Sequence, residues 1–285
     1  MKNRKKYIAD LLLLITAAIW GLGFYFQKVA SETTSPFCFN AMRYLIAALV
    51  ISVFTRFRLP LQGEARKYAL AAGFILYMAG MLQQVGLQTA SIGNASFITA
   101  VYIVLVPFFS ALILRRKIRT AHCVAAGLSL IGLYLISTSG KGLDRISRGD
   151  LIVFAGSVFW ALHILSVDKG VTVCDPVIFS AGQFLVAGIL HLLTFITIGQ
   201  ADISGLSQSW PYAAASGVLV LGLAFTFQAV AQKNTGETEA SILMGMESVF
   251  GALFGALLYH EQFGAVQIAG MALIFAAVLI TVLKN

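Results

Sequence analysis

Charged side chains are scarce in this sequence. Asp, Glu, Lys and Arg together make up 11% of the 285 residues, whereas hydrophobic residues make up 59%. A soluble domain carries about 25% charged residues, so this chain has too few polar residues to cover a globular surface. The composition therefore indicates a protein whose surroundings are largely lipid.

Cysteine is also sparse, and its spacing excludes two further classes of protein. Only Cys38, Cys123 and Cys174 occur, an odd number scattered along apolar stretches. Disulfide frameworks need paired cysteines, and structural zinc sites need clustered ligands. We interpret the three as small core residues and expect neither a metal nor a cofactor.

Motifs of the common enzyme classes are missing as well. Gly140-Lys141-Gly142 lacks the earlier glycine and the following Ser or Thr of a Walker A loop, so we do not expect ATP to drive this chain directly. No His-Glu-x-x-His or Gly-x-Ser-x-Gly pattern occurs, and the chain is not expected to be an enzyme. The formal net charge of +8 has no soluble surface on which to form a basic stripe, so nucleic acid is not an expected partner.

Long apolar runs dominate what is present. Each crossing of a bilayer about 30 Å thick needs roughly 20 residues of helix, because backbone polar groups must be satisfied within the helix itself. Ten such runs alternate with short polar breaks, at residues 8–29, 37–55, 68–88, 93–114, 120–137, 150–167, 176–198, 211–231, 239–258 and 264–283. The sequence thus predicts an all-α membrane protein of ten transmembrane helices, with the lipid bilayer as a partner.

The placement of basic residues indicates the orientation, because short loops rich in Lys and Arg stay in the cytoplasm. With the N-terminus inside, 15 Lys and Arg residues fall at cytoplasmic ends. The outer loops then hold four, namely Lys28, Lys141, Arg145 and Arg148. Three of these four disfavour the assignment, but the balance places both termini in the cytoplasm. The expected location is the inner membrane of a bacterial cell.

An internal repeat divides the chain in two. At offsets of 140 to 145 residues the matched pairs include Asp10 with Asp150, Trp20 with Trp160, Gln84 with Gln228 and Ser96 with Ser241. Each half holds five expected helices, so the second half enters the membrane from the opposite side, as in the inverted repeats of alternating-access transporters. We predict a first repeat at 1–139, a linker at 140–149 and a second repeat at 150–285.

Several short motifs then point to a family. The first helix of each half begins with Asp-Leu and carries a central tryptophan, the second helix contains Arg43-Tyr44, and residues 239–261 include Glu247-Ser248-Val249 and Tyr259-His260-Glu261. On these residues the chain resembles the drug/metabolite transporter superfamily, in the ten-helix form with two EamA domains. Two positions depart from the family pattern. Arg116 stands where a terminal glutamate is expected, and Ser248 replaces a proline that would kink the helix.

The resemblance implies a secondary transporter of small metabolites, commonly an exporter of amino acids or related compounds by alternating access. An importer or a drug exporter of the same superfamily remains an alternative, although the first helix lacks the essential Glu of the four-helix multidrug exporters. A channel-like protein or a membrane scaffold would not require two inverted copies. A small-molecule substrate is the expected partner, and a homodimer stays possible.

Ionisable residues inside a membrane are costly unless paired or hydrated, and so they mark candidate functional sites. Glu247 lies near the middle of its expected helix. Burial favours the neutral form of a carboxyl group, which makes Glu247 a candidate for proton coupling. Arg43 could bind a substrate carboxylate through its planar guanidinium. The structural alternatives are an ion pair between the two, or an arginine that reaches the membrane interface.

Other residues near mid-helix complete the expected cavity. The repeat places Trp20 opposite Trp160 and Tyr102 at the position of Glu247, so these side chains are expected to face the pseudo-twofold axis. Aromatic residues can equally pack against lipid, a histidine can be a packed core residue, and glutamines can bridge helices. The expected lining is Trp20, Arg43, Gln84, Tyr102, Trp160, His163, Gln228 and Glu247.

Overall fold

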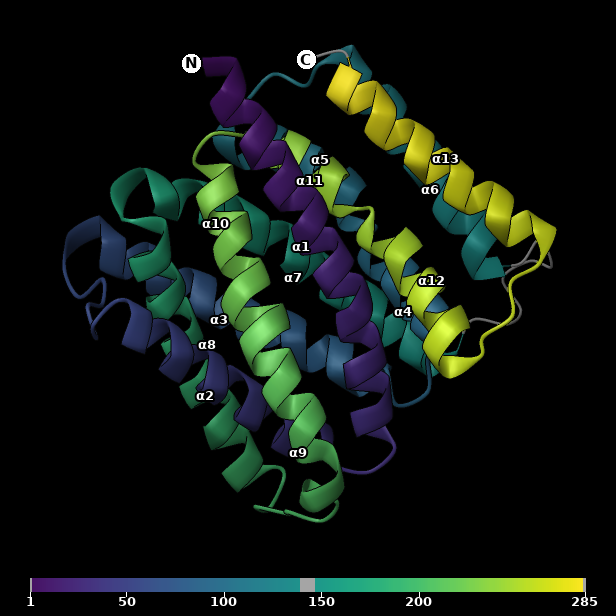
Figure 1. Cartoon of the computed structure of the whole chain (residues 1–285). Coiled ribbons are helices and arrows are strands. Elements are labelled where there is room, and N and C mark those ends of the chain that lie inside the picture. Colours follow the sequence, from purple (N-terminus) through teal and green to yellow (C-terminus); the bar gives the residue numbers. More distant parts are fainter. Residues whose placement is uncertain (1, 139–146, 284–285) are drawn as a thin grey trace.

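The computed structural model describes residues 2–138 and 147–283, and nearly all of them are helical (Figure 1). The first half consists of α1 (Lys2–Ser31), α2 (Pro36–Phe54), α3 (Gly63–Gly86), α4 (Ile92–Thr99), α5 (Tyr102–Leu114) and α6 (Thr120–Thr138). The predictions for Lys141, Arg145, Lys284 and most of the linker lie outside the described residues.

The second half repeats this order. It consists of α7 (Arg148–Val173), α8 (Pro176–Thr197), α9 (Leu206–Ala215), the π-helical segment η2 (Ser216–Phe225), α10 (Thr226–Gln232), α11 (Glu237–Met244), α12 (Glu247–Tyr259) and α13 (Ala265–Leu283). Eight crossing segments of the described chain are long and apolar enough to span a membrane, and α6 and α13 contain the two shorter apolar ones. The expected all-α architecture of ten segments is confirmed.

The fourth crossing of each half is broken near its middle. A tight turn at Ala100–Val101 separates α4 from α5, and another at Gly245–Met246 separates α11 from α12. Neither break is made by a proline. Pro107 lies inside α5, and the hydroxyl of Ser248 donates a hydrogen bond of 2.8 Å to the Gly245 carbonyl oxygen, so the second break forms without the family's proline.

Both broken segments also end alike, as the internal repeat predicts. Arg115 and His260 adopt the left-handed conformation at φ 54° and 56°. The next residue in each half, Arg116 or Glu261, donates its backbone N–H back to Ser110 or Gly255. The same local structure thus ends α5 in the first half and α12 in the second half, at equivalent positions of the repeat.

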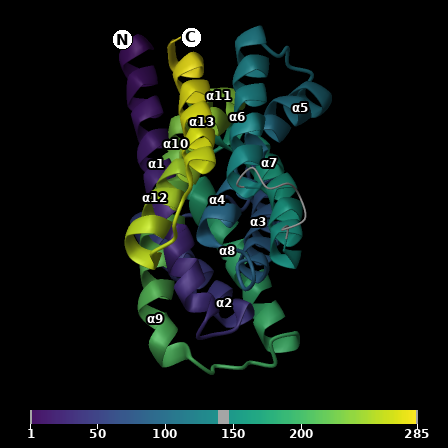
Figure 2. The same cartoon turned by 90° about the vertical axis from the view of Figure 1, so that its right-hand side faces the viewer.

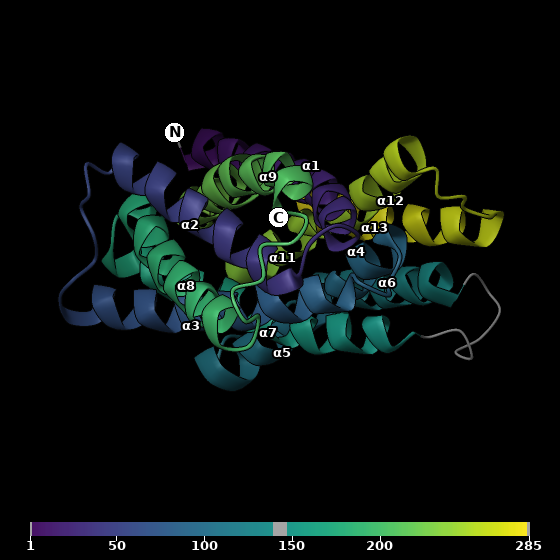
Figure 3. The ribbon, with the colours of Figure 1, turned by 90° about the horizontal axis from the view of Figure 1, so that it is seen from below.

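The helices of one half pack mainly against those of the other. The view from below shows α2 beside α8 and α3 beside α7 (Figure 3). The helix α1 packs on α12 and on the segment formed by α9, η2 and α10. A space enclosed by α1, α2, α7 and η2 is therefore bounded by both halves.

The helices α6 and α13 lie side by side at one edge of the bundle (Figures 1 and 2). A Cβ atom added at Gly132 would collide with the Gly270 carbonyl oxygen, and one added at Gly270 would collide with the Gly132 carbonyl oxygen. Small residues allow such a close approach of two membrane helices.

Polar and apolar side chains are distributed as a membrane requires. Phe54, Leu112 and Leu257 are more than half exposed on the outer surface, whereas Arg43 and Glu247 are buried between the helices. The apolar exterior can contact lipid. The polar groups lie in the interior, because their contact with hydrocarbon would cost free energy.

Candidate functional site: a polar cavity between the two halves

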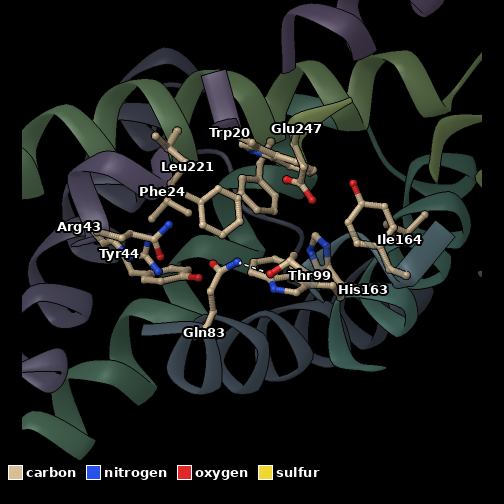
Figure 4. Close-up of a pocket in the computed structure, with 15 residues that line it drawn as sticks. Trp20, Phe24, Arg43, Tyr44, Gln83, Thr99, His163, Ile164, Leu221 and Glu247 are labelled. Atoms are coloured by element: carbon tan, nitrogen blue, oxygen red, sulfur yellow. Dashed lines mark hydrogen bonds between the residues drawn. The ribbon is translucent and has the colours of Figure 1, made fainter. Parts of the chain in front are cut away.

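Side chains from both halves line one cavity in the middle of the bundle, which we call the central cavity (Figure 4). The helix α1 contributes Trp20, Phe24 and Gln27, and the related helix α7 contributes Trp160, His163 and Ile164. The remaining lining residues are Arg43, Tyr44, Gln83, Thr99, Tyr102, Val220, Leu221, Phe225 and Glu247.

Six of the eight residues expected from the sequence meet in this lining. They are Trp20, Arg43, Tyr102, Trp160, His163 and Glu247. The break in each fourth crossing explains two of them, since Tyr102 begins α5 and Glu247 begins α12. Helices that start inside the membrane turn their N-terminal ends toward a central site, where they favour negative charge.

Gln84 and Gln228 are not among the lining residues. The amide of Gln84 donates a hydrogen bond of 3.0 Å to the Gln27 carbonyl oxygen, which joins α3 to α1. Gln228 donates to the side chain of Gln232 at 2.8 Å, and Gln232 donates to the Ile164 carbonyl oxygen at 3.1 Å. Gln84 thus bridges two helices, the alternative considered for the glutamines, whereas Gln228 contacts a residue of its own helix and reaches α7 only through Gln232.

Glu247 is 3% exposed, and its Oε1 atom has no hydrogen-bond partner among the described residues. The Tyr102 hydroxyl lies close enough for electrostatic interaction with this carboxyl group, yet it also lacks a hydrogen-bond partner of good geometry within the described chain. A buried carboxyl group with an unused oxygen is costly unless it is neutral or meets a ligand. One oxygen of the Glu247 carboxyl group is thus left without a hydrogen bond in the described chain.

Arg43 is 2% exposed and has no acidic partner among the described residues. Its Nε donates a hydrogen bond of 2.8 Å to Asn40 Oδ1, and its Nη1 lies 3.5 Å from the hydroxyl of Ser216. The guanidinium carbon is 5.4 Å from the centre of the Phe39 ring and 5.1 Å from that of Tyr44. These neutral groups hold the guanidinium in place without balancing its charge.

The expected alternative of an ion pair between Arg43 and Glu247 is therefore not seen. The two side chains lie toward different ends of the central cavity, with aromatic rings between them (Figure 4). A buried arginine without a carboxylate is energetically unfavourable on its own, and an anionic ligand group would compensate it.

Aromatic rings form one wall of the central cavity. The Phe225 ring lies 4.5 Å from that of Trp20, 5.7 Å from that of Trp160 and 5.6 Å from the imidazole of His163, measured between centroids. Both indole N–H groups are buried without a hydrogen-bond partner in the described chain. The wall therefore offers apolar contact area together with two unused donors.

Other lining residues were not singled out by the sequence. Gln83 donates a hydrogen bond of 3.1 Å to the hydroxyl of Thr99, and both side chains reach the cavity (Figure 4). Neighbouring positions on a helix point about 100° apart, so the repeat that selected Gln84 missed Gln83 by a single residue. Phe225 carries no charge, and the repeat matches it with no aromatic residue in the other half, so neither criterion of the sequence analysis could have selected it.

The central cavity is small in this structure, with a volume of about 30 Å³. A buried water needs about 10 to 15 Å³ on the same measure, whereas sites that enclose a metabolite span roughly 300 Å³ or more. In this structure the central cavity is therefore too small to enclose a ligand of metabolite size.

The fold and this cavity together define a class of protein. Ten membrane-crossing segments in two inverted halves, broken helices that begin at mid-membrane and a polar space between the halves are features of alternating-access carriers. The model of the EamA-like transporter family matches residues 7–138 and again residues 147–283. The chain belongs to the EamA-like transporter family, and it is a multi-pass membrane transporter of the drug/metabolite type.

Individual relatives agree with this assignment. A protein of Archaeoglobus fulgidus named uncharacterized transporter is 27% identical over 286 residues, a match that covers 98% of this chain and 87% of the relative. The uncharacterized inner membrane transporter YedA of Escherichia coli K12 is 24% identical and covers 93% of this chain and 88% of its own. A crystal structure with 18% identity superposes at a TM-score of 0.79 over 97% of this chain and 96% of the other, and it supports the fold.

Proposed function

We propose that this protein exports a small metabolite that carries a carboxylate, such as an amino acid, from the cytoplasm of a bacterial cell. The central cavity is the transport site, and it opens to the two sides of the membrane in turn. The observation that carries this proposal is the pair of buried ionisable groups, Arg43 and Glu247, that face one cavity and do not pair with each other.

Each group has a role in the proposal. The fork of Arg43 binds the substrate carboxylate, because two of its nitrogens already have neutral partners that hold its orientation. Glu247 exchanges a proton with the cavity, or binds the amino group of the substrate when it is ionised. The aromatic wall around Phe225 packs against the apolar body of the substrate.

The orientation in the membrane is part of the proposal. Both termini lie in the cytoplasm, as the distribution of basic residues indicates. The inner membrane is the proposed location, and a relative described as an inner membrane transporter supports it. The chain moves its substrate without a chemical step of its own.

The first test is the export of a panel of amino acids from cells that express the wild type or Glu247→Gln, with and without a protonophore. We expect one compound to leave faster with the wild type, and we expect both the substitution and the protonophore to abolish the difference. Glu64→Gln is the matched control, because the Glu64 side chain is 57% exposed and should tolerate the same change.

Three outcomes would contradict parts of this proposal. Normal export by Glu247→Gln would make Glu247 a structural residue. Export that fails for every compound, although the protein is folded in the membrane, would show that the substrate class is wrong. A flux that does not saturate with substrate would favour a channel over a carrier.

A further inference from the structure

A cluster of charged side chains joins the two halves at the end of the bundle where α1 begins, which we call the N-terminal face. Arg116, just beyond α5, donates hydrogen bonds to the carboxylate of Glu237 and, at 2.9 Å, to that of Asp168. The hydroxyl of Ser110 donates to Glu237 as well. Arg116 and Ser110 belong to the first half, whereas Asp168 and Glu237 belong to the second.

This ion cluster is partly shielded from water. The side chains of Asp168 and Glu237 are 8% and 4% exposed, while that of Arg116 is 43% exposed. Arg116 and Glu237 also line a cavity of about 180 Å³ beside the cluster. The electrostatic attraction within an ion pair shielded in this way is stronger than within an ion pair on an open surface.

The cluster lies between the central cavity and the N-terminal face. Asp168 is on α7, as are Trp160 and His163 of the central cavity, and it lies about 12 Å beyond Trp160 along the helix axis at 1.5 Å per residue. Glu237 begins α11, whose other end leads to Glu247. Both acidic residues are therefore on segments that connect the cluster directly to the central cavity.

The inverted repeat supplies a counterpart on the opposite face. Glu261 follows α12 as Arg116 follows α5, and its carboxylate accepts hydrogen bonds of 2.8 and 2.9 Å from the backbone N–H groups of Ile92 and Gly93. These two residues form the first turn of α4. In each half, then, the residue after the broken fourth crossing contacts the first turn of the broken crossing in the other half.

The two contacts carry opposite charges at equivalent positions, with Arg116 in the first half and Glu261 in the second. The start of a helix carries partial positive charge and binds a carboxylate, as α4 binds Glu261. The same partial positive charge at the start of α11 would repel Arg116. The carboxylates of Glu237 and Asp168 make this end of α11 negative, and they bind the arginine. The departure of Arg116 from the family pattern is thereby matched by two acidic residues in the other half.

We propose that the cluster of Arg116, Asp168 and Glu237 is the gate that closes the central cavity toward the N-terminal face, and that Glu261 on α4 closes the opposite face. Both contacts are formed in this structure, in keeping with the small volume of the central cavity. Opening toward one face requires the contact at that face to break while the other stays closed. This inference rests on the proposed function, because it takes the central cavity as the transport site.

The test measures how fast a cysteine in the central cavity reacts with a membrane-impermeant maleimide from each side. Leu221→Cys is introduced after the three native cysteines have been replaced by alanine, and right-side-out and inside-out vesicles are compared. We expect Arg116→Gln to raise the labelling rate at least fivefold from the N-terminal face and to leave or lower it from the other. Glu261→Gln should give the mirror-image result.

Two controls distinguish a gate from a contact that stabilises the whole bundle. Arg115→Gln makes the same chemical change next to Arg116 at a residue without an ion pair in the described chain, and it should label as the wild type does. Arg116→Lys keeps one ionic contact and should restore most of the closure. If Arg116→Gln does not insert stably, Asp168→Asn weakens the same cluster and should open the same face.

Labelling of Arg116→Gln at the wild-type rate from both sides would overturn the gate. An equal rise from both sides would also overturn it, because the cluster would then stabilise the whole bundle and not one closure. The labelling needs no substrate, so failure of the amino-acid panel with this pattern intact would refute the proposed substrate and leave the gate standing. Normal export together with unchanged labelling would refute the gate alone.

Discussion

Arg43 combines complete burial with purely neutral partners. Asn40 receives its Nε–H, and the Asn40 amide in turn donates a hydrogen bond of 3.1 Å to the Gly80 carbonyl oxygen on α3. The position of the guanidinium is thus determined by a short chain of hydrogen bonds that crosses from α2 to α3. Such a chain fixes the orientation of the guanidinium and therefore of the N–H groups that remain free for a ligand.

We predict that Arg43→Lys raises the KM for a carboxylate substrate about 10-fold to 100-fold. A lysine keeps the charge but loses the bond to Asn40 and the planar fork, and a hydrogen bond to a charged group is worth about 1.5 to 3 kcal/mol. The measurement is the concentration dependence of uptake into inside-out vesicles. Arg58→Lys, in an exposed loop, is the control, and an unchanged KM for Arg43→Lys would exclude Arg43 from substrate binding.

Among the elements, the broken crossings and η2 shape the site most directly. Breaks at 100–101 and 245–246 place Tyr102 and Glu247 at helix starts in the middle of the membrane. The wider turns of η2 carry Val220, Leu221 and Phe225 to the same cavity. The hydroxyl of Thr16 donates a hydrogen bond of 3.2 Å to the Ala224 carbonyl oxygen within η2, which shows how a neighbouring helix stabilises an irregular one.

At this scale we predict that Gly132→Ala destabilises the protein by about 1 to 3 kcal/mol, because the added methyl group forces α6 away from α13. Gly127→Ala on the same helix is the matched control, since a Cβ atom there has open space around it. The measurement is thermal unfolding in detergent, followed by aggregation or by thiol labelling of the buried Cys38. Equal stability of the two variants would contradict the close contact of α6 and α13.

The molecule as a whole has an apolar exterior, a polar centre and a contact between the halves at each end. Lys6 on α1 pairs with Glu239 at 3.4 Å on the N-terminal face. On the opposite face, the ammonium group of Lys28 donates hydrogen bonds of 3.1 Å to the Leu87 and Ala90 carbonyl oxygens. Polar contacts thus concentrate at the two ends and at the centre, where an alternating-access carrier has its closures and its site.

The topology leads to a prediction for intact cells. An impermeant maleimide should label Asp202→Cys, in the loop between α8 and α9, without permeabilisation. It should label Arg58→Cys, in the loop between α2 and α3, only after the membrane has been opened. An odd number of crossings separates these loops, so labelling of both from outside would contradict the fold, and the reverse pattern would contradict only the orientation.

Sequence alone determined the number and order of the crossing segments, because each long apolar run must form a helix in a membrane. Apolar runs of roughly 20 residues can only be helices in lipid, and an odd number of them per repeat can only give inverted halves. It also marked Glu247 and Arg43, because a charge in an apolar run stands out from its surroundings. The repeat added Trp20, Trp160 and Tyr102 by relating each position to one in the other half.

Tertiary structure decided which of these residues meet and what they contact. Gln83 reaches the cavity and Gln84 does not, because one residue of helix rotation separates them. Arg116 was visible in the sequence only as a departure from a pattern. Its partners Asp168 and Glu237 are 52 and 121 residues away, and only the packing of one half against the other brings them together. Periodicity describes a helix by itself, whereas the site and its closures form where helices from both halves meet.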